Sequence, residues 1–503
     1  MSDRDAPGTG STRGGELRSP IEANSENFFS GYDAGATTEL TAAQRGIWLD
    51  QQIIDDPTAY AVAELTRLEG GIDVDAWLRA VDGVLADTPT LRMRLHEGVS
   101  GESSPRMSND AVPARARLVD LREEPDTEAA AERWVRRALS EPLDLTTGVV
   151  SHACLLLTGH DSAQWFLRVH HIALDGYGFA LVGRELAERY GCERESAPVR
   201  SLSRSRRRAR EAAELYRRAT AELLIYPRGR QAREDRAFWS TQEPDEPCSP
   251  LAVGGDPLRP MRRGIDVRPP FGRADPVVLV SALALLAGAV NRRDEAVVGV
   301  HVMGRVGRDL LSAPCHTQNL LPVRVRVAPD QTVTGLLKEV GGAWERCRIH
   351  QLYRHEDVRA DRALAGGEAL CDVALNIVPF GRIRHYGRAL GRSEPVWDGP
   401  AEGLVLDVRG ARETSALELI APRGSLGPGA LQAYARVLST LLTTLEGAVA
   451  DESSEENRTG STRLRDLPLG DSPVRGNPGD SGAGGVIGDR TEADASDTVD
   501  EAS

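Results

Sequence analysis

The stretch WFLRVHHIALDGYGFALV, residues 165–182, places two adjacent histidines at the end of an apolar run and an Asp-Gly pair shortly after them. An earlier apolar run, HACLLLTG (152–159), is separated from it by the turn-forming residues 159–162. Two such runs joined by a short polar turn predict an antiparallel hairpin whose second strand ends at the histidines. Apolar residues at helical spacing over 177–190 predict a helix directly afterwards.

The two histidines are predicted to have different functions. Successive side chains on a strand point to opposite faces, so His170 and His171 cannot face the same surroundings. Because histidine titrates near neutral pH, a cavity-facing His171 is the natural proton acceptor, and His170 is then architectural. Asp175 is close enough along the chain to brace the turn, and Gly176 permits a tight backbone before the helix. The competing interpretation is a pair of structurally satisfied histidines.

The rest of the chain mixes helices and strands. Thr41 followed by Gln44 forms a capping box that predicts a helix over 40–53. Further helices are predicted at 73–86, 204–223, 278–292, 333–347 and 429–449, and strands at 90–98, 296–302, 321–327, 372–378, 404–410 and 416–421. This mixture predicts an α/β (α+β) protein.

A chain of 503 residues is too long for one compact core, so two lobes are expected. A Pro- and Arg-rich passage over 244–275 marks their boundary. We therefore predict an N-terminal lobe at 37–245 and a C-terminal lobe at 246–450. The Gly-, Ser- and Asp-rich segments 1–36 and 451–503 are predicted to be disordered.

Composition excludes several classes of function. The net charge of −14 argues against nucleic acid as a partner. Six scattered cysteines form no C-x-x-C pair, which argues against a zinc site or a disulfide framework, and we predict no metal. We find no signal peptide and no apolar stretch of the roughly 20 residues that a membrane span needs. These features predict a cytoplasmic protein.

The motif His-His-x-x-x-Asp-Gly resembles the signature of the condensation domain of non-ribosomal peptide synthetases, a family of the chloramphenicol-acetyltransferase-like superfamily. Five other stretches resemble further motifs of that family, in the family's order, and together they cover about 38–450: LTAAQRGIWLDQQ (40–52), TLRMRL (90–95), REDRAFW (233–239), NLLPVRV (319–325) and HQLYRHEDVRAD (350–361). The second motif lacks the Arg-His that commonly precedes its Leu-Arg. No adenylation signature and no phosphopantetheine-bearing serine motif follows residue 450.

The resemblance implies two lobes in a V-shaped pseudo-dimer with a tunnel between them. It implies an acyltransferase that forms an amide between a thioester, held on the phosphopantetheine of a donor carrier protein, and an amine held on an acceptor carrier. Those carriers and other synthetase modules would be the partners, no cofactor would be bound permanently, and we expect a monomer.

The resemblance also assigns residues. The catalytic set would be His171, Asp175, Gly176 and His170, with His171 deprotonating or positioning the amine and Gly176 lending a backbone N–H to the oxyanion. Asp175 would pair with an arginine, for which Arg92 is the candidate. Two residues of the fifth motif would line the tunnel or pack in the core: Asn319 and Pro322.

Plain amide formation is favoured over epimerisation or cyclisation, and the fifth and sixth motifs look most like those of siderophore-type synthetases, including ones that accept an aryl-acid donor. Two rival functions remain open. One is a stand-alone acyltransferase that takes acyl-CoA, and the other is a non-catalytic module that only binds carrier proteins.

Overall fold

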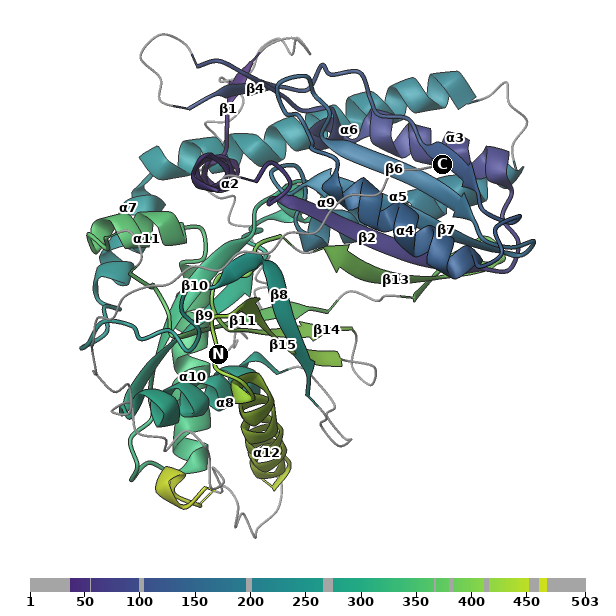
Figure 1. Cartoon of the computed structure of the whole chain (residues 1–503). Helices are drawn as coiled ribbons and strands as arrows, with labels where there is room; N and C mark the ends of the chain where they lie inside the picture. The colour runs from purple at the N-terminus through teal and green to yellow at the C-terminus, as the bar shows by residue number, and fades with distance from the viewer. Residues whose placement is uncertain are drawn as a thin grey trace, which may run out of the picture.

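The computed structural model describes residues 37–54, 56–98, 104–195, 201–265, 275–365, 368–379, 383–397, 399–410, 416–451 and 461–467. The segment 1–36 and most of 451–503, both predicted to be disordered, lie outside the described residues. Two lobes are arranged in a V, each built on a six-stranded sheet with helices packed against it (Figure 1). The predicted α/β class and two-lobe architecture are confirmed.

The first lobe contains the histidine motif. Its sheet has the order β12-β13-β2-β7-β6-β5, and the predicted hairpin is its antiparallel pair β6 and β7. One face of the sheet packs on α3 and α5 around Trp77, which is fully buried, and the other face packs on α4. The strands and helices are β2 (Ala61–Glu69), β5 (Arg117–Asp120), β6 (Ser151–Leu157), β7 (Ser162–His170), α3 (Val74–Asp87), α4 (Thr127–Ser140) and α5 (Gly176–Glu195).

The second lobe has the sheet order β10-β9-β11-β14-β15-β8. Its core is formed around α8, an almost wholly apolar helix that is buried along most of its length. The predicted strands and helices of this half are confirmed as β9 (Glu295–Val302), β10 (Asn319–Arg326), β11 (Val373–Val378), β14 (Val405–Arg409), β15 (Ala416–Arg423), α8 (Pro276–Asn291), α10 (Val333–Ile349) and α12 (Ala430–Asp451). The passage predicted to be a mere boundary contributes the edge strand β8 (Asp256–Gly264).

The predicted lobe boundary at 245/246 is wrong for one segment. Strands β12 (Ile383–Tyr386) and β13 (Ala389–Trp397) come from the second half of the chain but belong to the sheet of the first lobe. β13 pairs with β2, and the hydroxyls of Thr66 and Ser393 hydrogen-bond at 2.8 Å across that pair. An exposed edge of β2 would offer unpaired backbone groups, and the crossing strand satisfies them. The lobes are therefore joined by a shared sheet (Figure 1).

The predicted strand over 90–98 is also only partly correct. Residues Pro89–Arg92 form a 3-10 turn, and only Arg94–His96 is a strand, β3, which pairs with β4 (Arg106–Ser108). The hydroxyl of the fully buried Thr90 donates to the carbonyl of Pro314 at 3.1 Å. This tertiary contact with the second lobe competes with the local alternation that favoured a strand.

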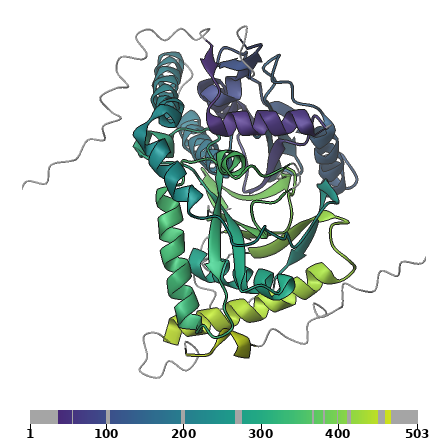
Figure 2. The ribbon, with the colours of Figure 1, turned by 90° about the vertical axis from the view of Figure 1, so that its left-hand side faces the viewer.

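Other helices connect the lobes. α2 (Ala42–Ile53) begins with the predicted capping box of Thr41 and Gln44. The predicted Arg-rich helix is α6 (Ser201–Ile225), where Arg218 reaches Asp309 of the short α9 (Arg308–Ser312) at 2.9 Å. α7 (Arg230–Ser240) and α11 (His355–Asp361) pack together where the lobes meet, and Figure 2 shows α2 and α11 from that side.

A short part of the segment predicted to be a disordered tail is ordered. The backbone N–H of Leu464 donates to Gln331 at 2.9 Å and that of Val333 donates to Thr462 at 3.0 Å, which ties residues 461–467 to the start of α10. Leu464 and Leu467 are buried in the core of the second lobe. The burial of these two leucines thus stabilises the docked segment, although the sequence around them is mostly polar.

Replacing Leu464 with alanine is expected to lower the free energy of unfolding by about 2 kcal/mol, the low end for a buried leucine, because a terminal segment can adjust to the cavity. Urea unfolding of the full chain measures this loss. Arg465→Ala, in the same turn but half exposed, should stay within about 0.5 kcal/mol of the parent protein. Equal effects of the two changes would contradict the packing of this segment.

Candidate active site

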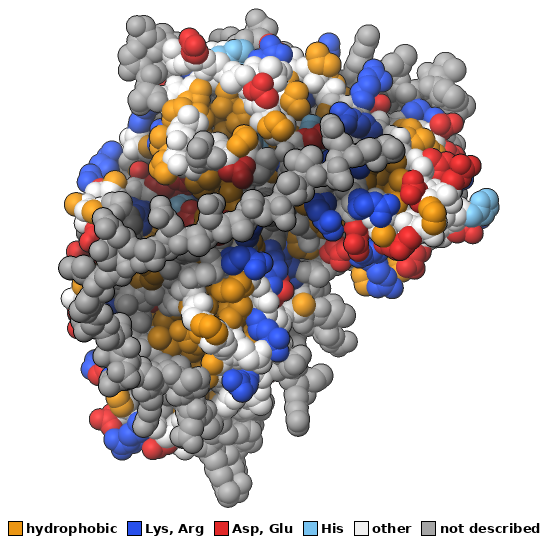
Figure 3. Space-filling model, in the orientation of Figure 1, with side chains coloured by type: hydrophobic (Ala, Val, Ile, Leu, Met, Phe, Trp, Pro, Cys, Tyr) orange, Lys and Arg blue, Asp and Glu red, His pale blue; other side chains and the backbone are white. Residues whose placement is uncertain are grey.

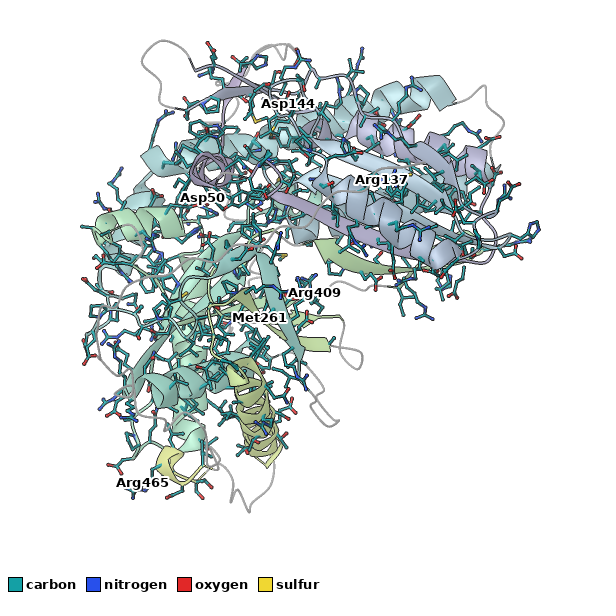
Figure 4. All side chains as sticks on the ribbon, in the orientation of Figure 1. Asp50, Arg137, Asp144, Met261, Arg409 and Arg465 are labelled. Atoms are coloured by element: carbon teal, nitrogen blue, oxygen red, sulfur yellow. The ribbon has the colours of Figure 1, made fainter. Side chains whose placement is uncertain are left out.

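A cavity of about 240 Å³ lies between the two lobes. Its wall comes from β2 and the first turns of α5 in one lobe, from β9, β11 and β14 in the other, and from the crossing strands β12 and β13. Arg409, at the end of β14, lines this cavity and is labelled between the lobes in Figure 4. Along the right-hand part of the boundary between the lobes, basic and acidic side chains lie side by side (Figure 3).

His171 lines the cavity, and its ring is held in one tautomer. Its Nδ1 lies 2.8 Å from the carbonyl oxygen of Leu174, which can only accept a hydrogen bond. The Nδ1 atom of the neutral ring therefore carries the proton, and the Nε2 atom keeps its lone pair. The His171 backbone N–H donates to the carbonyl of Tyr60 at 2.6 Å, which fixes the residue at the end of the sheet. The ring is a half-buried base within reach of the cavity.

His170 is held inside the first lobe. Its side chain is 2% exposed, and its Nδ1 accepts a hydrogen bond from the backbone N–H of Ile172 at 3.2 Å. Burial, reinforced by the neighbouring His171 and Arg168, lowers the pKa of His170 to about 3. The ring is therefore neutral at physiological pH and acts as a hydrogen-bond acceptor that shapes the turn, which supports the architectural interpretation.

This buried ring makes stability depend on pH. In the unfolded chain a histidine binds a proton below about pH 6.5, whereas folded His170 stays neutral down to about pH 3. Between these pH values the unfolded state binds more protons than the folded state. The free energy of unfolding therefore decreases as the pH is lowered through this window. His170 is expected to account for about 1 kcal/mol of the unfolding free energy lost between about pH 7 and about pH 5.5. His170→Asn keeps an acceptor for Ile172 and should show a loss smaller by that amount in urea titrations. An unchanged loss would rule out a neutral buried His170.

Asp175 forms a buried ion pair, but with an arginine that the sequence did not indicate. Its Oδ1 and Oδ2 lie 2.9 and 3.1 Å from a guanidinium nitrogen of Arg305, and both side chains are almost fully buried. Burial alone would lower the pKa of Arg305, but the charge and hydrogen bonds of Asp175 outweigh it and raise the pKa. The predicted partner Arg92 is wrong, because its Nε donates to the carbonyl of Ala111 at 3.3 Å.

The Asp175 carboxylate also joins the two lobes. It accepts hydrogen bonds from the backbone N–H of Gly178 at 2.7 Å, at the start of α5, and from the backbone N–H of Thr317 at 3.0 Å in the second lobe. Arg305 in turn donates to the carbonyl of Cys315 at 2.7 Å. Asp175 thus positions the turn that carries His171, and we do not assign it the role of a base.

Gly176 is the first residue of α5 and lines the cavity. A side chain at this position would meet no atom within 4 Å, and its φ is not positive. Gly176 was predicted to permit a tight backbone, but its backbone does not adopt a conformation that requires glycine. Its absent side chain leaves open space at the cavity wall, and no described residue accepts a hydrogen bond from its N–H, which is one of the open donors of a helix start.

Residues of the second lobe that were not predicted from the sequence complete the cavity. His316 packs edge-on against His171 with ring centroids 4.8 Å apart, and Gln318 donates from Nε2 to Nδ1 of His301 at 2.9 Å. His301 and Gln318 both line the cavity. Asp175 and Arg305 are 130 positions apart, so no local pattern could have paired them. The one local signal was the predicted strand 296–302, which contains His301 and ends shortly before Arg305.

Asn319 and Pro322 support the structure and do not line this cavity. The amide of Asn319 donates to the carbonyls of Gln351 and Tyr353 at 2.9 and 2.8 Å, and its oxygen accepts from the backbone N–H of His355 at 3.1 Å. Asn319 thereby holds the sixth motif against the fifth. Pro322 is buried inside β10.

The described residues contain no group of three or more His, Cys, Asp or Glu side chains that could hold a metal ion. In the cluster around α11, Glu356 pairs with Arg354 at 2.8 Å, and His355 contacts the Asn319 oxygen at 3.1 Å. Within the same residues, none of the helices is both long enough and apolar enough to cross a membrane.

Comparison with known proteins points to one family. Residues 35–257 match the family model "Condensation domain". The chain is 31% identical over 398 residues to the isonitrile lipopeptide synthase of Streptomyces coeruleorubidus, which covers 76% of this chain and 26% of that protein. It is 26% identical over 395 residues to the dimodular nonribosomal peptide synthase of Bacillus subtilis, covering 76% and 16%. It is 27% identical over 387 residues to enterobactin synthase component F of Escherichia coli K12, covering 73% and 29%.

Solved structures agree in fold. The starter condensation domain of rhizomide synthetase RzmA matches with a TM-score of 0.70 at 24% identity, covering 86% of this chain and all of that one. The first condensation domain of the calcium-dependent antibiotic synthetase matches with a TM-score of 0.68 at 23% identity, covering 87% and 100%. The chain spans less than a third of the curated relatives named above. It belongs to the condensation-domain family of the nonribosomal peptide synthetases.

Proposed function

We propose that this chain is an acyltransferase that joins an acyl or aminoacyl thioester, carried on the phosphopantetheine of a donor carrier protein, to the amine of an acceptor in secondary-metabolite biosynthesis of the siderophore or lipopeptide type. The observation that carries this proposal is the inter-lobe cavity, where the lone pair of His171 Nε2 and the N–H of Gly176 lie in the same lining. One is a base for the amine, and the other is a donor for the carbonyl oxygen.

The residues fit a balanced reaction. The amine nitrogen attacks the thioester carbonyl carbon, and His171 Nε2 takes the proton that the nitrogen loses as the C–N bond forms. The carbonyl oxygen gains negative charge in the tetrahedral intermediate, where the Gly176 N–H at the start of α5 stabilises it. The C–S bond then breaks, and the sulfur leaves as a thiolate that receives the proton from His171. The products are an amide and a free phosphopantetheine thiol, and His171 is restored.

Charge and size support carrier-bound substrates. Two arginines in the cavity wall, Arg384 and Arg409, favour the anionic phosphate of a phosphopantetheine arm, and Arg409 also pairs with Asp407. The volume of about 240 Å³ exceeds the roughly 150 Å³ that holds one benzene molecule. An aryl group or a medium-length acyl chain therefore fits. No cofactor of the enzyme's own is needed, because the arm belongs to the partner carriers.

Mass spectrometry of intact carrier proteins tests the proposal. Donor and acceptor carriers, each loaded with a candidate substrate, are incubated with the full chain, and the expected result is loss of the acyl group from the donor with a matching mass gain on the acceptor. A parallel reaction supplies the same acyl group as a CoA thioester. Efficient transfer from CoA but none from the carrier would overturn carrier specificity, and no transfer from a full panel in either format would overturn the acyltransferase.

A further inference from the structure

A second histidine, His301, faces the cavity from the lobe opposite to His171. It lies near the end of β9, and its neighbours Val302 and Met303 line the same cavity. Its Nδ1 lies 2.9 Å from the Nε2 of Gln318, the residue directly before β10. The cavity thus contains two imidazoles, one from each lobe, and each has its Nδ1 engaged by a different kind of partner.

The two partners impose opposite tautomers. A carbonyl oxygen can only accept, so His171 keeps its proton on Nδ1 and a lone pair on Nε2. An amide nitrogen can only donate, so His301 accepts at Nδ1 and carries its proton on Nε2. Burial, together with the nearby His355 and His171, lowers the pKa of His301 to about 4, so this ring stays neutral and is a poor proton acceptor at physiological pH.

Gln318 is itself held in place. Its backbone carbonyl accepts a hydrogen bond from Arg354, which also pairs with Glu356 of α11. The next residue, Asn319, is fixed by the carbonyls of Gln351 and Tyr353. The backbone that carries Gln318 therefore belongs to the same network that holds the sixth motif, and the side-chain amide reaches His301 from this fixed point.

We propose that His301, fixed by Gln318, is a specificity-determining hydrogen-bond donor in the donor pocket, and that it selects acyl groups bearing an oxygen that can accept a hydrogen bond over plain alkyl groups. This inference rests on the proposed function, because it takes the cavity as the place where the acyl group lies. The ligand class is an oxygenated short acyl chain or aryl acid, with the oxygen acceptor within the acyl group itself.

The apolar part of the cavity lining makes the single N–H donor of His301 important for selectivity. The wall of the same cavity includes apolar side chains of both lobes, among them Val62, Phe179, Val302 and Ile377. A plain alkyl group would bury the His301 N–H against these walls without a partner, whereas an oxygen acceptor would satisfy it. A site that hydrogen-bonds its substrate rejects analogues lacking the acceptor for this reason.

Binding of unreactive analogues tests the proposal without needing the acceptor. The probes are pantetheine amides, which cannot transfer their acyl group, carrying a hexanoyl chain or a hexanoyl chain with one ketone placed at successive carbons. Isothermal titration calorimetry on the full chain should show at least one keto analogue binding roughly 5- to 10-fold more tightly than the hexanoyl analogue. His301→Phe, which keeps a ring but has no N–H, should bring this ratio to about one.

Gln318→Glu provides a sharper variant. A carboxylate can only accept, so it would draw the proton to Nδ1 of His301 and leave a lone pair facing the cavity. The keto preference should then disappear although His301 is intact, and the change of tautomer should appear in the ring ¹⁵N shifts. The control is His160→Ala, an exposed histidine in the turn between β6 and β7, which should keep the wild-type ratio.

The outcomes separate this inference from the function on which it rests. A keto preference that is lost in both His301→Phe and Gln318→Glu supports it, even if no amide is formed in turnover assays. Amide formation with no keto preference at any position would overturn the role of His301 and leave the acyltransferase standing. A preference that survives His301→Phe, or an absence of binding by every analogue, would also overturn it.

Discussion

Replacing His171 with alanine is expected to slow amide formation by roughly 10²- to 10⁴-fold, the usual contribution of a positioned base. The ring is half-buried, and its side-chain hydrogen bond to Leu174 is local, so the fold should survive its loss. Without Nε2 of His171, only water or buffer can accept the proton that the amine nitrogen loses as the C–N bond forms. Single-turnover rates with loaded carriers measure the effect.

The pH dependence of the variant separates a base from a mere positioning group. If His171 acts as the base, the His171→Ala rate should rise more steeply with pH than the parent rate, because hydroxide must then accept the proton that His171 takes in the parent. If His171 only orients the amine, the variant should show the same pH dependence as the parent at a lower rate. His160→Ala is the matched control and should leave both rate and profile unchanged. Parent-like turnover in His171→Ala would contradict the assignment.

Arg305→Met is expected to lower the free energy of unfolding by about 3 to 5 kcal/mol, because it leaves the charge of Asp175 buried without its counter-ion. Methionine fills part of the same volume, so lost packing is a minor part of the effect. Asp175 also holds the start of α5 against the second lobe, so the rate of amide formation should fall together with stability. Urea unfolding and single-turnover rates on the same samples measure both.

The sequence-based candidate supplies the control for this pair. Arg92→Met should cost less than about 1 kcal/mol, because Arg92 contacts only a carbonyl and not Asp175. The double variant Asp175→Asn with Arg305→Met should be less destabilised than the sum of the two single changes, since each single change leaves its partner unpaired. Additive effects, or a larger loss from Arg92→Met than from Arg305→Met, would contradict the structural pairing.

Local patterns predicted the parts of the fold and the site that depend on neighbouring residues. The β6–β7 hairpin and the capping box at Thr41 were predicted correctly because a turn and a helix start are specified within a few positions. The opposite environments of His170 and His171 followed from strand alternation in the same way. Chain length predicted two lobes, and the family resemblance added their arrangement in a V with a tunnel between them.

Features that depend on distant parts of the chain were missed. Arg305 meets Asp175 across 130 positions, and β13 joins β2 across more than 300, so neither pairing leaves a local signal. The ordered residues around Leu464 were missed because two leucines in a polar segment do not reveal a docking site. The same holds for His301 and Gln318, whose hydrogen bond exists only once β9 and β10 pair.

The central claim is that acyl transfer takes place in the cavity beside His171, at the start of α5. Gly176→Leu tests it most directly, because Gly176 lines the cavity, a side chain there meets no atom within 4 Å, and the added bulk should obstruct the cavity while the backbone N–H remains. Gly191→Leu is the matched control in the same helix, at a position with equal space but about 22 Å farther along the axis.

Single-turnover amide formation and urea unfolding are to be measured for both variants. The predicted result is loss of nearly all transfer in Gly176→Leu with unfolding free energy close to that of the parent, and parent-like behaviour of Gly191→Leu in both assays. Transfer at the parent rate by a folded Gly176→Leu protein would show that the thioester and the amine meet elsewhere.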